Sequence, residues 1–247
     1  MINNQILATL KQLGCQYAFH YQSDGQPAQQ ASNCQRFRSA SIIKVPILLA
    51  WACLERQGLV DRGEICELDS EPQVHGAGFA WQMKARRLPF HDILLMMIAT
   101  SDNLCANLII QHIGLARLQS VIRDELNLPG AELQRKLMDY EARSRGLDNY
   151  ISPDALVRCF DLVRNLPDAQ KNWVEAMLLA NTDAALLKRE HPRDTLDFYH
   201  KSGSMEGVLH EWGYTRSKRI FLLTEGVVSE PPVFEVFGQL GRLLLEG

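Results

Sequence analysis

Long apolar runs and an excess of charge of either sign are both missing from this sequence. Its 26 lysines and arginines stand against 29 aspartates and glutamates, a net charge of −3, and they form no basic stripe. Nucleic acid and anionic membranes are therefore not expected partners. No stretch reaches the roughly eighteen consecutive apolar residues of a membrane span. We expect a monomer that acts on a small molecule.

The sequence also shows no close cysteine pairs, no histidine spacing of a metal site, and no secretory-signal pattern in its opening residues. Its six cysteines form no C-x-x-C motif, and its seven histidines show no H-E-x-x-H or comparable spacing. We therefore predict reduced thiols and no metal site. The opening MINNQILATLKQLG has neither the cationic region nor the apolar region of a secretory signal. As written, the sequence predicts a cytoplasmic protein.

Strand-like patterns lie towards both ends of the chain, and helical patterns lie between them. Alternation of apolar and polar residues predicts strands, and apolar spacings of three and four predict helices. The expected strands are 15–22, 197–205, 209–216 and 218–227. The expected helices are 3–14, 41–57, 91–100, 104–114, 115–126, 152–166, 172–190 and 234–246.

This order of elements predicts an α+β fold. Strands do not alternate with helices, so the sheet is expected to be antiparallel, with flanking helices. We predict one domain over residues 1–247. Its sheet lobe takes about 1–40 and 192–247, and an all-helical lobe takes about 41–191. A cleft is expected where the lobes meet.

Two neighbouring polar residues of the expected strand 209–216 are candidates for the lining of the cleft. His210 and Glu211 follow each other in LHEWGY. Because side chains of a strand alternate between its two faces, one of the two is expected to face outward.

A single lysine lies in the apolar segment SIIKVPILLAWACLERQ, residues 41–57. Ser41 and Lys44 share one face of the expected helix, a turn apart. Burying an ammonium group is unfavourable unless the group is paired or loses its proton. A lysine with a lowered pKa can act as the base that activates a serine hydroxyl as a nucleophile. The segment therefore predicts nucleophilic catalysis near a helix start.

Two further short motifs have ordinary structural explanations when each is taken alone. Ser101, Asp102 and Asn103 separate two apolar helical segments, as a turn with an N-cap would. The motif K-S-G at 201–203 fits a strand end with a glycine bulge. Composition gives chance expectations of about 0.4 for S-x-x-K, 0.03 for S-D-N and 0.04 for K-[ST]-G. Their joint occurrence is expected on the order of once in two thousand such sequences.

These three motifs, in this order, mark class A β-lactamases and penicillin-binding proteins. The chain resembles the family of penicillin-recognising serine hydrolases over nearly its full length. The resemblance implies that Ser41 is the acylated nucleophile, Lys44 its base, and Ser101 a proton shuttle to the leaving nitrogen. It also implies that Asn103 contacts the substrate amide or Lys44.

The resemblance assigns the late K-S-G strand to substrate binding. It implies that Lys201 and Ser202 bind the substrate carboxylate, and that Gly203 and Ser204 belong to the same substrate-binding strand. The backbone N–H groups of Ser41 and Ser204 would form the oxyanion hole. Members of the family act outside the cytoplasmic membrane, so the resemblance implies a periplasmic or secreted protein.

The deacylating part of the family's site matches less well. Class A β-lactamases carry an E-x-x-x-N motif that positions the hydrolytic water. The corresponding stretch here, RKLMDYEARSRGLDNYISPDAL, offers Glu141, and the next asparagine is Asn149, eight residues on. Glu141 is therefore a candidate catalytic base. The alternative is that Glu141 is a surface residue in a charged stretch with Arg143 and Arg145.

Three functional hypotheses follow. The first is a serine hydrolase of class A β-lactamase type that cleaves a β-lactam, or a related amide or ester, through a Ser41 acyl-enzyme without metal or organic cofactor. The second is a penicillin-binding or penicillin-sensing protein that is acylated and deacylates slowly. The third is an esterase or peptidase that uses the same residues. Slow deacylation separates the second from the first, and substrates other than β-lactams separate the third. In all three, Asp102 is expected to be structural, as the cap of a helix.

Overall fold

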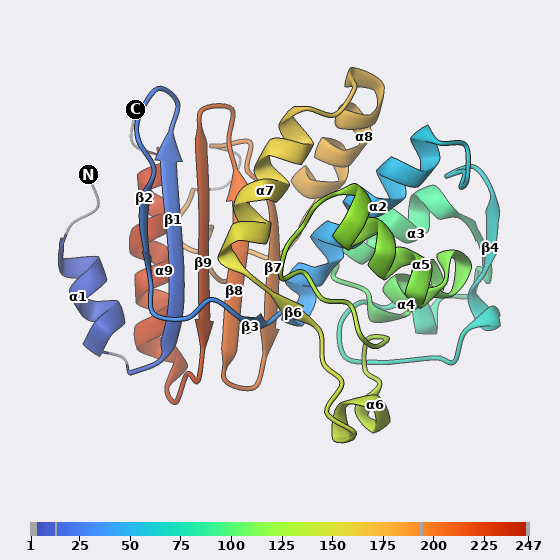
Figure 1. Cartoon of the computed structure of the whole chain (residues 1–247), viewed down its shortest axis with the longest axis horizontal. Helices are drawn as coiled ribbons and strands as arrows, with labels where there is room; N and C mark the ends of the chain where they lie inside the picture. The colour runs from blue at the N-terminus through green and yellow to red at the C-terminus, as the bar shows by residue number, and fades with distance from the viewer. Residues whose placement is uncertain (1–3, 13, 193–194, 246–247) are drawn as a thin grey trace.

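A five-stranded antiparallel sheet forms one side of the molecule in the computed structural model, which describes residues 4–12, 14–192 and 195–245 (Figure 1). The strand order is β2-β1-β9-β8-β7. The bounds are β1 Gln16–Ser23, β2 Gln29–Ser32, β7 Tyr199–Met205, β8 Val208–Tyr214 and β9 Lys218–Glu225. All the expected strands are confirmed. The polar strand β2, with the sequence QQAS, was not expected because it shows no apolar alternation.

The remaining elements lie mostly on the other side of the molecule. The helices are α1 Asn4–Gln12, α2 Lys44–Arg56, α3 Phe90–Ala99, α4 Asn103–Ile113, α5 Leu115–Ser120, α6 Tyr140–Ser144, α7 Pro153–Arg164, α8 Asp168–Leu179 and α9 Glu230–Leu245. The short antiparallel pairs are β3 Phe37–Arg38 with β6 Tyr150–Ile151, and β4 Ile65–Glu67 with β5 Arg87–Pro89. Within the described ranges, no helix is both long enough and apolar enough to span a membrane.

Helices cover both faces of the sheet (Figure 1). On one face, Phe237 of α9 packs in an apolar cluster with Phe19 and Leu222 of the sheet. On the other face, the ring of Phe160 in α7 stacks on Trp212, with ring centroids 4.7 Å apart. The Trp212 indole N–H donates to the carbonyl of Leu156, also in α7. The sheet therefore contributes to two cores.

This double coverage corrects the expectation for His210 and Glu211. Both side chains are buried, because a helix or loop lies against each face of β8. His210 Nε2 is 2.9 Å from the carbonyl oxygen of Arg38. Glu211 Oε1 is 2.6 Å from His200 Nδ1, and its other oxygen accepts from the backbone N–H of Leu187. Alternation along a strand places one residue outward only when one face of the sheet is open to water.

The apolar segment 41–57 forms a buried helix, but the helix begins later than expected. Ser41 lies in a 3₁₀ turn, η1 Ala40–Ile43, and α2 starts at Lys44. Pro46 therefore lies in the first turn of α2, where its missing N–H breaks no helical bond. From Val45 to Leu54 the residues of α2 are buried, as the sequence predicted.

The expected helix 172–190 is wrong in its second half, because α8 ends at Leu179. Beyond it, side chains bond to nearby backbone groups in place of helical bonds. Asn181 Oδ1 accepts from the N–H of Asp183, and Asp183 Oδ1 accepts from the N–H of Ala185, each at 2.9 Å. Asn181 also donates to the carbonyl of Ile98, which ties this segment to the end of α3.

The expected helices 91–100, 104–114 and 152–166 are confirmed as α3, α4 and α7. The start of α7 follows the predicted chemistry, since the Ser152 hydroxyl accepts from the N–H of Ala155. The segment 115–126 divides into α5 and a π-helical turn, Val121–Glu125. Helix α9 begins at Glu230, earlier than expected, and its first turn includes Pro231 and Pro232, a position where proline is tolerated.

Asp102 is confirmed as the N-cap of α4. Its Oδ1 accepts from the N–H of Cys105, and its Oδ2 accepts from the N–H groups of Phe79 and Ala80. The side chain is buried. Asp102 therefore joins the start of α4 to the segment at Phe79 and Ala80, which precedes α3 in the chain. It also fixes its neighbours Ser101 and Asn103.

Replacing Asp102 by alanine should lower the free energy of unfolding by about 2–4 kcal/mol, because a cap and two further backbone donors lose their acceptor. Urea unfolding followed by circular dichroism measures the change. The exposed Asp154, in the first turn of α7, provides the control: Asp154→Ala loses only an interaction with the helix dipole and should lower the free energy of unfolding by less than about 1 kcal/mol. Equal urea midpoints for the two variants would contradict the structural role of Asp102.

Candidate active site

The amine of Lys44 is the point at which two of the motifs meet. Its Nζ donates to the carbonyl oxygen of Ser101 at 2.6 Å and to Oδ1 of Asn103 at 2.8 Å. The same nitrogen is 3.1 Å from Ser41 Oγ and 3.2 Å from Ser101 Oγ. Lys44 is fully buried. The S-x-x-K and S-D-N motifs, 57 or more residues apart, therefore form one cluster.

Local backbone geometry presents the S-D-N motif to this amine. Ser101 takes a left-handed conformation, φ 56°, between α3 and α4. A non-glycine residue in this conformation is strained unless its surroundings hold it, and the bond from Lys44 to its carbonyl is one such restraint. Asn103 donates through Nδ2 to the carbonyl of His75. Both the oxygen and the nitrogen of the Asn103 amide are thus hydrogen-bonded, and this holds its Oδ1 towards the Lys44 amine.

The K-S-G motif approaches the same serine from the sheet. It lies on β7, at the edge of the sheet. A Cβ atom on Gly203 would come within 2.8 Å of the Ser41 nitrogen and 2.9 Å of the Ile42 nitrogen. Only glycine therefore allows this strand to lie against the turn that carries Ser41.

All three motifs line one cavity of about 210 Å³. Ser41 and Ser101 come from the helical side, and Lys201, Ser202, Gly203 and Ser204 come from β7. These six residues are among those expected from the sequence. The structure adds a third wall, the segment 181–183 that follows α8. Sequence reasoning missed this wall. The polar run N-T-D inside an otherwise helical pattern was the one signal for it.

Burial sets the charge of the two lysines. It lowers the pKa of Lys44 far below the ordinary lysine value of 10.5, and the nearby positive charge of Lys201 lowers it further. Burial also lowers the pKa of Lys201, to about 8, against the opposing effect of Asp183 and Glu211. Burial and the repulsion between the two nitrogens therefore favour the unprotonated form of Lys44, beside a Lys201 that keeps its charge at neutral pH.

An unprotonated amine has two N–H groups and one lone pair. Here the two carbonyl-type oxygens of Ser101 and Asn103 are the nearest acceptors of its N–H groups. The lone pair is then left for the hydroxyl of Ser41. In this arrangement the Lys44 amine can remove the proton from Ser41.

Glu141 is not brought into this cluster. Its side chain is 82 % exposed and pairs with Arg145, four residues on at the C-terminal end of α6. The loop that carries it is closed at its base by a buried ion pair, Arg135 with Asp148. Where this loop contacts α4, it does so through Leu137, whose N–H and carbonyl bond to the side chain of Asn107. The geometry favours the surface alternative for Glu141.

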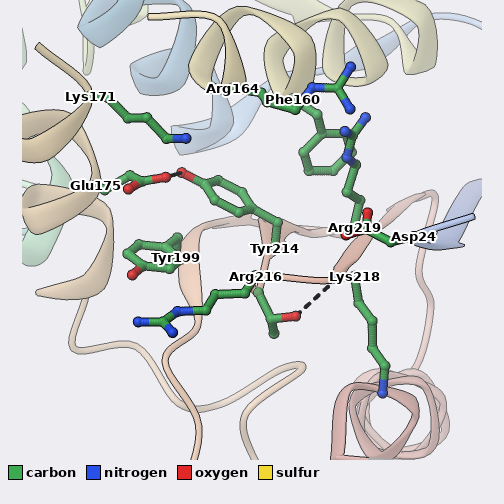
Figure 2. A pocket seen from close by; sticks show the side chains of 11 residues that line it. Asp24, Phe160, Arg164, Lys171, Glu175, Tyr199, Tyr214, Arg216, Lys218 and Arg219 are labelled. Carbon is green, nitrogen blue, oxygen red and sulfur yellow. Dashed lines mark hydrogen bonds between the residues drawn. The ribbon is translucent and has the colours of Figure 1, made fainter. Parts of the chain in front are cut away.

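A larger cavity, about 400 Å³, lies near the start of β7 (Figure 2). The rings of Tyr199 and Tyr214 stack in it, with centroids 5.1 Å apart, and the Tyr214 hydroxyl donates to Glu175. None of the described residues that line it is a serine. The smaller cavity therefore carries the candidate acyl-transfer chemistry.

A serine next to a buried amine, in a cavity between a sheet and a helical region, is typical of serine hydrolases. The chain belongs to the beta-lactamase enzyme family, whose model matches residues 1–247. This confirms the resemblance that the motifs predicted. The comparison with curated proteins gives no match.

Solved structures show the same fold. The chain is similar to the β-lactamase from Sphaerobacter thermophilus, with a TM-score of 0.85, 21% identity, and coverage of 98% of this chain and 96% of that chain. It is similar to an ancestral class A β-lactamase, with a TM-score of 0.85, 17% identity, and coverage of 99% of both chains. For PBP-A the TM-score is 0.82, the identity 20%, and the coverage 98% and 94%. The predicted α+β fold of class A β-lactamase type is confirmed.

Gly203→Ala should lower the rate of Ser41 acylation by about a hundredfold, because an added methyl group must push β7 away from the Ser41 backbone. Labelling with a fluorescent penicillin measures the rate, and circular dichroism checks the fold. Gly63→Ala is the matched control, since a Cβ there meets only the side chain of Asp61. A normal labelling rate in Gly203→Ala would show that this close approach is dispensable.

Proposed function

We propose that this protein is a serine hydrolase that works through an acyl-enzyme on Ser41, that β-lactams acylate it, and that it releases them slowly. The observation that carries the proposal is the buried amine of Lys44, 3.1 Å from Ser41 Oγ and bonded to oxygen atoms of Ser101 and Asn103. The family and the fold support a β-lactamase-like serine hydrolase.

Acylation begins with the transfer of the Ser41 hydroxyl proton to Lys44. The freed Oγ attacks the carbonyl carbon of the substrate, and the carbonyl π electrons move to its oxygen. The backbone N–H groups of Ser41 and Ser204 are the proposed donors to this oxyanion. The C–N or C–O bond then breaks, and the Ser101 hydroxyl gives its proton to the leaving atom. Lys44, 3.2 Å from Ser101 Oγ, returns a proton to that oxygen.

The second step, hydrolysis of the acyl-enzyme, needs a base for the attacking water. Glu141 is exposed and paired with Arg145, so it is poorly placed for this role. Asp102 has both carboxylate oxygens bonded to backbone N–H groups. These contacts support slow deacylation, the second of the three hypotheses.

The rate of acylation should follow a bell-shaped pH profile. The rising limb should lie well below pH 10.5, because burial keeps the pKa of Lys44 low and only its unprotonated form accepts the proton. The falling limb should lie near pH 8, where Lys201 loses its charge. Stopped-flow measurement of acylation by a chromogenic cephalosporin gives the profile.

Lys201→Arg tests the falling limb, since arginine stays charged throughout this range. In this variant the rate should stay level above pH 8. A wild-type rate that rises without a break to pH 10 would contradict the assigned roles of both lysines.

Intact-mass spectra with excess penicillin G should show an adduct that requires Ser41 and persists for many minutes. Ser41→Ala should show none. Glu141→Gln should leave the rate of adduct loss within twofold of wild type, because the carboxylate lies on the surface. Rapid loss of penicillin without a lasting adduct, together with slower turnover in Glu141→Gln, would instead support a β-lactamase that uses Glu141.

A further inference from the structure

An acidic side chain occupies the place where the resemblance puts the substrate carboxylate. The Ser202 hydroxyl donates to Oδ2 of Asp183 at 2.5 Å. Asp183, Lys201 and Ser202 line the same cavity as Ser41. The hydroxyl expected to bind a carboxylate of the substrate is thus already bonded to a carboxylate of the protein.

Asp183 is held in this position from several sides. Its other oxygen, Oδ1, accepts from the N–H of Ala185. Its own N–H donates to Asn181, whose side chain is buried and bonds to the carbonyl of Ile98 on α3. The early end of α8 directs the chain across the cavity at this point. The Asp183 carboxylate is therefore a fixed part of the cavity wall.

The charges at this end of the cavity balance. Among the described residues that line it, Lys201 is the one cation and Asp183 the one anion. Lys201 Nζ donates to the backbone oxygen of Ser202, so the cation and the bonded pair of side chains lie next to each other. A substrate carboxylate at Ser202 would gain the attraction of Lys201 but meet the like charge of Asp183 at short range.

We propose that Asp183 is a specificity-determining residue: it makes the Ser41 site select acyl compounds that present a neutral or cationic hydrogen-bond donor, such as an amide N–H or an ammonium group, where penicillins present a carboxylate. This inference rests on the proposed acylation of Ser41. It assigns the preferred substrate to esters or amides without a carboxylate beside the scissile bond, the third of the three hypotheses.

Penicillin G and its methyl ester form a matched pair of probes, since the ester removes the negative charge of the carboxylate and adds only a methyl group. Mass spectrometry of the Ser41 adduct over time gives the acylation rate for each. The wild-type protein should react with the ester at least as fast as with the acid. Asp183→Asn, which keeps the shape of the side chain, should react with the acid at least tenfold faster than wild type and change little with the ester.

The ester reaction also reports on folding, because a misfolded variant would lose both reactions. Asp154→Asn removes an exposed acid that is not among the residues lining this cavity and should leave both rates unchanged. A wild-type protein that prefers the acid tenfold, with the same preference in Asp183→Asn, would overturn this inference and leave the acyl-enzyme proposal intact. No adduct with either compound, in either protein, would overturn the proposed function and the inference with it.

Discussion

The site depends on the burial of the Lys44 amine, whose hydrogen-bond partners among the described residues are hydroxyl, carbonyl and amide oxygens and no carboxylate. The Lys44 nitrogen bonds to the carbonyl of Ser101 and the amide of Asn103. Both acceptors are neutral, so they satisfy its N–H groups without favouring the charged form as a carboxylate would. The same bonds tie α2 to the turn between α3 and α4, where Ser101 takes its left-handed conformation. Burial therefore lowers the pKa of this base, while its hydrogen bonds fix the second serine of the site.

The sheet holds the other half of the site against this amine. Strand β1 pairs with β9, so residues near both ends of the chain form one sheet, and β7 lies at its edge. Gly203 lets that edge contact the backbone of Ser41, and Lys201 brings a second buried nitrogen near Lys44. Helices α7 and α9 cover the two faces of the sheet, and α8 lies against the edge strand β7.

The two steps of hydrolysis are unequally supported. The contacts for attack by Ser41 are short and buried, whereas the loop that would supply a base for water presents Leu137 to α4 and Glu141 to solvent. The end of the cavity at Ser202 differs from a simple carboxylate site, because Asp183 bonds to the hydroxyl. The first feature underlies our proposal of slow deacylation, and the second underlies our proposal that Asp183 disfavours a substrate carboxylate.

The sequence by itself determined the local features of this protein. Ser41 and Lys44 are one turn apart whatever surrounds them, the apolar run of α2 requires burial, and Ser152 caps its helix through neighbouring atoms. The antiparallel sheet also followed from local alternation, except for the polar strand β2.

Only the tertiary structure decided where the charged side chains of distant segments lie. It ended α8 early and put Asp183 beside Ser202, it left Glu141 on the surface, and it buried both His210 and Glu211. The contact of Asp183 with Ser202 and the burial of His210 and Glu211 depend on segments far apart in the chain, which no local pattern of residues contains.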